Sequence, residues 1–128
     1  MSIENRDVGL LAQRFFDSIE AGNIEAVADC YAEDVEIWHN TDLKVESKTQ
    51  NLKVLRGFVG HIADIKYERR RLSVFSGGFV QQHVLTGRRP DGVSVELPAA
   101  IICAVRDGRI VRLDEYFDSA QVGTFVGR

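Results

Sequence analysis

The sequence predicts an α+β fold in which three N-terminal helices pack on a strongly curved, mainly antiparallel sheet to form a cone-shaped barrel. Two patterns predict it. Apolar residues recur at helical spacing in the first half of the chain, whereas apolar and polar residues alternate between short turn sequences in the second half. With 128 residues and 45% apolar content the chain can bury one continuous core. We therefore expect a single domain over residues 1–128.

Two helices are expected at the start of the chain. The first spans about Asp7 to Ala21 and stops at Gly22, which tolerates the left-handed conformation. Asn23 can cap the second helix, which should end before the acidic pair at 33–34. Their apolar faces contain Val8, Leu11, Phe15 and Ile19 in the first helix and Ile24, Val27, Ala28 and Tyr31 in the second. Both helices are thus expected to cover a core.

A strand should follow, and after it a third helix. From Val35 to Asn40 the odd-numbered residues alternate with Glu36, Trp38 and Asn40, which is the period of a strand with two different faces. The segment 47–50 has the form of a capping box, so a helix is expected at about Lys48 to Ala63. This helix should lie across the sheet.

The rest of the chain is predicted to be a four-strand meander, because turn sequences separate its alternating segments. The expected strands are about Lys66 to Phe75, Gly78 to Arg88, Val93 to Arg106, and Arg109 to Asp118. A bent sheet with helices on one face encloses a concave space lined by apolar residues. That space is the natural place for a site.

Composition argues against several classes of protein. A formal charge of −3 gives no electrostatic reason to expect nucleic acid or an anionic membrane as partner, and Arg69–Arg71 reads as part of a solvated sheet face. The N-terminus lacks a secretory signal and no apolar run approaches the ~20 residues of a membrane span. Cys30 and Cys103 fit reduced, buried thiols, and neither they nor the three histidines form a metal pattern. We expect a cytoplasmic protein without a metal or other cofactor.

Both ends of the chain resemble known proteins. Phe15–Val27 (FFDSIEAGNIEAV), continuing into Tyr31–His39 (YAEDVEIWH), resembles the opening of ketosteroid isomerases. Asp107–Asp118 (DGRIVRLDEYFD) resembles the final hairpin of limonene epoxide hydrolases and SnoaL-like polyketide cyclases. The chain is therefore similar to the nuclear transport factor two-like superfamily, whose members include isomerases, hydrolases, dehydratases, cyclases and non-catalytic binders.

The resemblance to ketosteroid isomerases implies a changed site. The position of their catalytic aspartate falls on His39, and that of their helix-one tyrosine falls on Phe15. Their second oxyanion donor, a protonated aspartic acid, falls near Ile101. Because both donors are lost, we do not expect a steroid isomerase of that kind.

For epoxide hydrolases and for SnoaL-like cyclases, one catalytic acid has an acidic counterpart in this chain. Two positions of the Asp-Arg-Asp arrangement of the epoxide hydrolases fall on Val84 and Thr86, and the third falls on Glu115. The last-strand acid of SnoaL-like cyclases also matches Glu115, with Asp118 as the neighbouring alternative. The resemblance thus implies one acidic proton shuttle on the last strand.

His39 and Glu115 are the leading catalytic candidates. His39 shares a strand face with Val35 and Ile37, and an imidazole can take or give a proton near neutral pH. Glu115 shares a face with Leu113 and Phe117, where a carboxylate must be paired or protonated. We therefore expect His39, across the pocket, to be its partner. The alternatives are a structural, backbone-bonded or solvent-facing histidine, and reversed strand faces that place Asp114, Tyr116 and Asp118 inside.

His83 is a further candidate on a strand whose faces are ambiguous. With a register adjustment it could join His39, which would resemble the two-histidine dehydratases of the superfamily. Otherwise Gln82 and Thr86 would supply neutral polar contacts.

Apolar side chains should make up the ligand-binding surface. The candidates are Phe15, Phe58, Ile101, Leu113 and Phe117, although aromatic residues of this kind are more often simply core. None is cationic, so a small, neutral, apolar molecule is the expected ligand.

The sequence thus predicts a cofactor-independent enzyme that moves a proton in a buried pocket, as an isomerase, dehydratase, cyclase or hydrolase. The alternative is a non-catalytic ligand-binding or dimerisation domain of the same fold. We also expect a homodimer built on the outer sheet face, with Trp38, Val111 and Tyr116 as contacts.

Overall fold

Helices come first and last along the chain in the computed structural model, which describes residues 3–127. The elements are α1 (Ile3–Glu20), α2 (Ile24–Cys30), β1 (Tyr31–His39), β2 (Val45–Glu46), α3 (Lys48–His61), β3 (Ala63–Phe75), β4 (Gly78–Arg88), β5 (Ser94–Arg106), β6 (Arg109–Phe117) and α4 (Ser119–Val126). The predicted helices and the meander are thus present, with ends shifted by a few residues.

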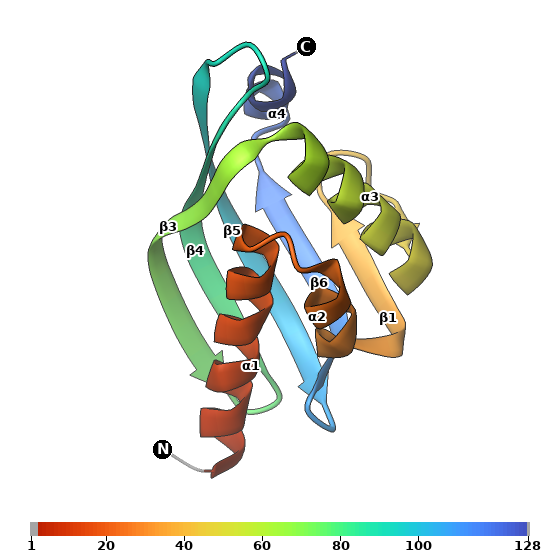
Figure 1. Ribbon diagram of the computed structural model, residues 1–128. Helices are drawn as coiled ribbons and strands as arrows, with labels where there is room; N and C mark the ends of the chain where they lie inside the picture. Colours follow the sequence, from red (N-terminus) through yellow and green to blue (C-terminus); the bar gives the residue numbers. More distant parts are fainter. Residues whose placement is uncertain (1–2, 128) are drawn as a thin grey trace.

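The strands form one sheet in the order β2-β1-β6-β5-β4-β3. The pairing of β1 with β6 is parallel and all the others are antiparallel. Figure 1 shows α1, α2 and α3 on one face of this curved sheet, with α4 at the end where the chain finishes. The expected α+β architecture, three helices on a mainly antiparallel sheet, is confirmed.

Local sequence signals set the helix ends. Ser47 and Gln50 form the predicted capping box at the start of α3. Asn23 caps α2 by accepting a hydrogen bond from the Ala26 N–H at 3.1 Å. The expected extension of α2 through Tyr31 is corrected, because Tyr31 is extended and begins β1. Its buried ring packs 5.6 Å from that of Phe15, so tertiary packing rather than helical spacing decides its conformation.

A bulge in β3 corrects the expectation for Arg70, whereas Arg69 and Arg71 are exposed as expected. The register shifts between Glu68 and Arg71, and Arg69 has a positive φ of 55°. The extra residue inverts the alternation and turns Arg70 toward α1. There its guanidinium lies 2.8 Å from an Asp17 oxygen and 3.0 Å from a Glu20 oxygen. Arg70 therefore ties the sheet to α1 instead of facing solvent.

Two elements were not predicted, the short strand β2 and the C-terminal helix α4. Asp118 caps α4 by accepting from the Ala120 N–H at 2.9 Å. At the other end of α4, the Arg89 guanidinium donates to the Thr124 carbonyl at 3.0 Å. Phe125 of this helix is buried in the core. The helix thus closes one end of the molecule.

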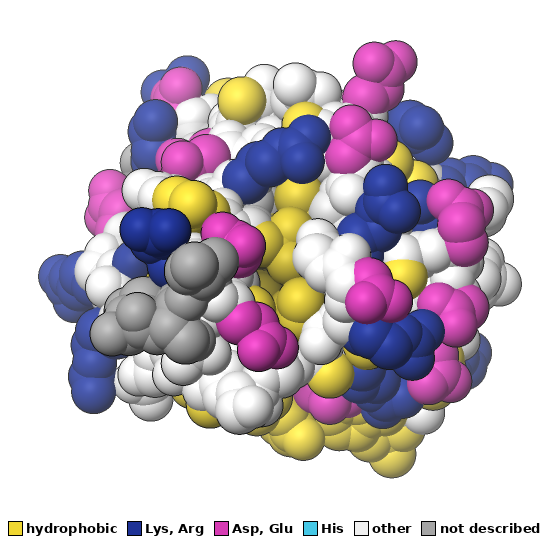
Figure 2. All heavy atoms as spheres, turned by 90° about the horizontal axis from the view of Figure 1, so that it is seen from below, with side chains coloured by type: hydrophobic (Ala, Val, Ile, Leu, Met, Phe, Trp, Pro, Cys, Tyr) yellow, Lys and Arg dark blue, Asp and Glu magenta, His cyan; other side chains and the backbone are white. Residues whose placement is uncertain are grey.

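The opposite end of the molecule, seen in Figure 2, carries a strip of hydrophobic side chains between charged ones. Residues of this end, including Val8, Leu11 and Gly108, line a hollow of about 370 Å³. Val8 and Leu11 are themselves buried, so the core reaches this end. Within residues 3–127, no helix combines the length and the apolar character that crossing a membrane requires.

Candidate active site

A cavity of about 530 Å³ lies among α3, α4 and the inner face of the sheet. Its lining is mainly apolar, with a few polar groups. The lining residues are His39, Asn51, Val54, Leu55, Gly57, Phe58, His61, Tyr67, Leu85, Leu97, Glu115, Phe117, Val122 and Phe125. None of these described lining residues is a lysine or arginine. Its size and composition are those of a small-molecule site.

The predicted apposition of His39 and Glu115 is confirmed. Val35, Ile37 and Leu113 are buried, so the faces of β1 and β6 that carry the pair point inward. The two residues are directly opposite one another in the parallel register of these strands. His39 Nε2 lies 3.1 Å from Glu115 Oε1, and each side chain is 18% exposed. The alternative with reversed strand faces is thereby excluded.

Asn40 holds the register that brings this pair together. Its backbone N–H donates to the Glu115 carbonyl at 3.0 Å. Its side chain donates to the Phe117 carbonyl at 3.0 Å and accepts from the Phe117 N–H at 3.1 Å. The amide thus continues the backbone ladder beyond the end of β1, which prevents β6 from slipping relative to His39.

The environment of His39 favours the protonated imidazole. Burial alone would lower the pKa of His39, but the hydrogen bond to Glu115 and its negative charge oppose burial, with smaller contributions from Glu46 and Asp42. The net pKa is raised above the ordinary value. Below that raised pKa, His39 is therefore an imidazolium that donates a hydrogen bond to Glu115.

His83 does not join this pair. Phe79, Gln81, His83 and Leu85 form the inner face of β4, whereas Gln82 is exposed on the outer face and does not contact the cavity. The Gln81 amide donates to His83 Nδ1 at 3.0 Å, and no contact of His83 with His39 is found in the described part of the chain. Burial, followed by the charge of Arg70, lowers the pKa of His83 to about 4. His83 is thus a neutral histidine of the core at neutral pH.

The other residues selected from the sequence divide into two groups. Phe58 and Phe117 line the cavity, as expected. Phe15, Ile101 and Leu113 are instead buried in the hydrophobic core and are absent from the lining. Asp118 is exposed, its carboxylate caps α4, and it is not among the residues that line the cavity.

Sequence reasoning missed three polar lining residues, Asn51, His61 and Tyr67. The Asn51 side chain accepts from the Tyr31 hydroxyl at 2.7 Å and donates to Glu46 at 3.1 Å. Tyr67 lines the cavity from β3. Within the expected strand, Tyr67 lies between the charged residues Lys66 and Glu68, and this alternation was a usable signal for an inward-facing side chain. Nothing in the sequence indicated Asn51 or His61.

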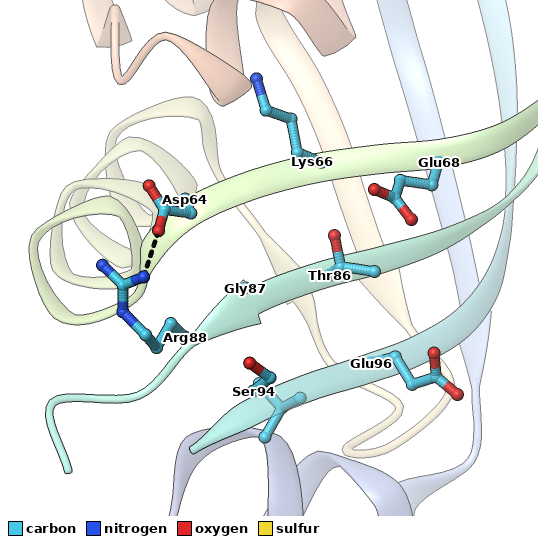
Figure 3. Close-up of a pocket in the computed structure, with 9 residues that line it drawn as sticks. Asp64, Lys66, Glu68, Thr86, Gly87, Arg88, Ser94 and Glu96 are labelled. Carbon is cyan, nitrogen blue, oxygen red and sulfur yellow. Dashed lines mark ion pairs between the residues drawn. The ribbon is translucent and has the colours of Figure 1, made fainter. Parts of the chain in front are cut away.

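A second hollow, of about 420 Å³, lies on the outer face of the sheet (Figure 3). Its side chains are mostly charged or hydroxylated and come from β3, β4 and β5. Arg88 and Asp64 pair across its edge at 2.7 Å. Both are half or more exposed, so this hollow is a solvated ionic surface, and the inner cavity is the better candidate.

Solved structures from several bacteria share this fold. A protein from Xanthomonas campestris pv. campestris that carries the name "putative polyketide cyclase" is 18% identical with a TM-score of 0.83, over 94% of this chain and 97% of its own. A "putative isomerase" from Bacillus subtilis is 15% identical with a TM-score of 0.84, over 99% and 96%. An NTF2-like protein of unknown function from Burkholderia pseudomallei K96243 is 16% identical with a TM-score of 0.83, over the full length of both chains. At these identities the likeness concerns the fold.

The family comparison covers most of the chain. No curated protein matches the sequence. Residues 12–113, from the middle of α1 to the middle of β6, match the family model described as the SnoaL-like domain. The chain therefore belongs to the SnoaL-like domain family, with the NTF2-like, ketosteroid isomerase-like fold.

Proposed function

We propose that this protein is a small-molecule enzyme that moves a proton within an apolar cavity, with His39 and Glu115 as its acid-base pair. One observation carries the proposal: an imidazole and a carboxylate lie 3.1 Å apart in the wall of a mainly apolar cavity. Partly buried acid-base pairs in a concave site are typical of catalytic centres. The proposed substrate is a small, neutral, largely apolar molecule.

The chemistry follows from the state of the pair. The carboxylate of Glu115 accepts a proton from one atom of the substrate, while the imidazolium of His39 can deliver a proton to another. Exclusion of water by the apolar walls strengthens both interactions and limits side reactions. Isomerisation, dehydration and cyclisation all need this combination, in which a proton leaves one atom and arrives at another. The names of the cyclase and isomerase structures with this fold are consistent with such chemistry.

The experiment begins with a screen of neutral ketones, lactones, epoxides and hydroxy compounds for turnover. On any substrate found, His39→Ala and Glu115→Gln should each remove most of the activity, and the double variant should lose little more, because the two groups share one task. Glu36→Gln, which changes an exposed carboxylate on the outer face of β1, is the matched control. Additive losses, or an active His39→Ala protein, would contradict the proposal. Binding without turnover would instead support the non-catalytic ligand-binding domain.

A further inference from the structure

The hydroxyl group of Tyr67 has no hydrogen-bond partner among the described residues. Its backbone N–H donates to Glu20 at 2.6 Å, and its ring packs edge-on against Phe16 and His83 at centroid distances of 5.0 and 4.7 Å. The Arg70 guanidinium lies 6.0 Å from the ring centroid. These contacts hold the ring in one orientation. None of them involves the hydroxyl.

The contrast with Tyr31 shows why this is unusual. Both tyrosines are buried, but the Tyr31 hydroxyl donates to Asn51 at 2.7 Å, whereas no hydrogen bond joins the Tyr67 hydroxyl to another described residue. Buried tyrosines ordinarily find such a partner. In residues 3–127 the one fully enclosed side-chain nitrogen or oxygen without a partner is His83 Nε2. The Tyr67 hydroxyl is therefore not enclosed, and because Tyr67 lines the cavity, it opens onto that space.

The electrostatic surroundings keep this hydroxyl a donor. Burial raises the pKa of Tyr67 well above the ordinary range, and the negative charges of Glu115 and Glu20 raise it further, against a smaller opposite effect of Arg70. The phenol thus stays protonated at all pH values at which the protein is expected to work. It shares the cavity with Glu115 and has a proton available for an acceptor.

We propose that Tyr67 is the hydrogen-bond donor that selects ligands carrying an acceptor oxygen, such as a ketone, lactone or epoxide, on an apolar ring. The proposal rests on the proposed function, since it concerns the same cavity. A ligand oxygen would give the Tyr67 hydroxyl the partner that the protein does not provide, while Leu85, Leu97 and Phe117 contact the apolar ring. An apolar ligand without oxygen would leave the hydroxyl unpaired, which disfavours its binding. Tyr67 is thereby a specificity-determining residue, and the acceptor oxygen is fixed relative to the acid-base pair.

The test compares two ligands that differ in one oxygen, 2-tetralone and its hydrocarbon tetralin. Dissociation constants for both are measured by NMR titration with the unmodified protein, Tyr67→Phe and Tyr116→Phe. Tyr116 is the matched control because it lies on the outer face of β6. The loss of one hydrogen bond should shift the ketone-to-hydrocarbon preference toward the hydrocarbon about tenfold in Tyr67→Phe and not in Tyr116→Phe. The cost of removing the ketone from water cancels in this comparison of ratios.

The melting temperature shows whether Tyr67→Phe changes ligand preference only by disturbing the fold. Because the Tyr67 hydroxyl makes no bond within the described chain, Tyr67→Phe should keep the melting temperature of the unmodified protein, whereas Tyr31→Phe, which leaves Asn51 without its donor, should lower it. An unchanged ligand preference in Tyr67→Phe overturns the proposal, and so does a preference that is lost in His39→Gln instead. Failure of both ligands to bind the unmodified protein also overturns it. These outcomes are measured by ligand binding and do not depend on turnover. The acid-base proposal is tested separately, by the turnover of Glu115→Gln.

Discussion

His39 and Glu115 lie opposite one another on the only parallel strand pair of the described sheet, with Nε2 and Oε1 3.1 Å apart. They are 76 residues apart in the chain, and Asn40 fixes the register that joins them. This relationship gives the apolar cavity its acid-base pair.

The raised pKa of His39 depends on Glu115 and should fall when that carboxylate is removed. In Glu115→Gln the burial of the imidazole remains while the opposing charge is lost, so the pKa should drop below the ordinary value of about 6.5. The His39 ring signals in an NMR pH titration report it directly, and Glu36→Gln is the control. With its folded-state pKa raised, His39 contributes stability below about pH 6.5 that is lost as pH rises through the folded pKa. A pKa that does not move in Glu115→Gln would show that the pair is not coupled.

His83 should make the fold sensitive to acid. Its pKa of about 4 is depressed in the folded protein, so between about pH 6.5 and pH 4 the unfolded chain binds a proton that the folded chain does not. The free energy of unfolding should therefore fall on acidification through this range, by up to roughly 3 kcal/mol from this residue. His83→Leu should flatten that part of the curve in urea unfolding, whatever its effect on absolute stability. Parallel curves for the two proteins would refute this.

Asp118 should act on stability and not on turnover, because its carboxylate caps α4 and does not line the cavity. Asp118→Ala should destabilise the protein by about 1 kcal/mol, whereas Asp118→Asn, an equally good cap, should be close to neutral. Thermal or urea unfolding measures the difference. A loss of activity in Asp118→Asn at unchanged stability would instead assign the carboxylate a chemical role.

Neutral ligands should stabilise the protein more than anions. The cavity lining contains the Glu115 carboxylate and no described lysine or arginine, so a ligand carboxylate or phosphate would be buried without a dedicated partner. Thermal shifts of a matched set, such as a ketone and the corresponding carboxylate at equal concentration, measure this. Larger shifts with the anions would contradict it.

We expect the protein to form a homodimer through the outer face of the sheet. Trp38 and Tyr116 pack edge-to-face at 5.3 Å on this face, and Ile102 and Tyr116 are each more than a third exposed. Ile102→Glu should shift the protein toward the 14.3 kDa monomer in light scattering at micromolar concentration. Leu10→Glu, a similar change at an exposed site on α1, should leave the assembly unchanged. A monomeric unmodified protein would count against the dimer.

Local chemistry made several features predictable from the sequence. The side chains of Ser47 and Gln50 define the start of α3 within one turn, because a capping box satisfies backbone donors that have no other partner. Period-two alternation placed His39 with Ile37, and Glu115 with Leu113, on inward faces. Because the burial of the apolar neighbours orients the whole face, His39 and Glu115 could be assigned to the inner face before their distance was known.

Other features were decided only by the tertiary structure, because they depend on contacts between segments distant in the chain. The register of β1 on β6 brings His39 to Glu115. A bulge at Arg69, which no turn sequence indicated, turns Arg70 toward α1. The sequence could not separate residues that fill the core from those that line the cavity, since both are apolar. Phe15 and Phe117 had the same pattern in the sequence, but Phe15 packs in the core and Phe117 lines the cavity. The Tyr67 hydroxyl, which has no hydrogen-bond partner among the described residues, is likewise a feature of the assembled cavity, because the partners of a side chain are known only when its neighbours have been placed.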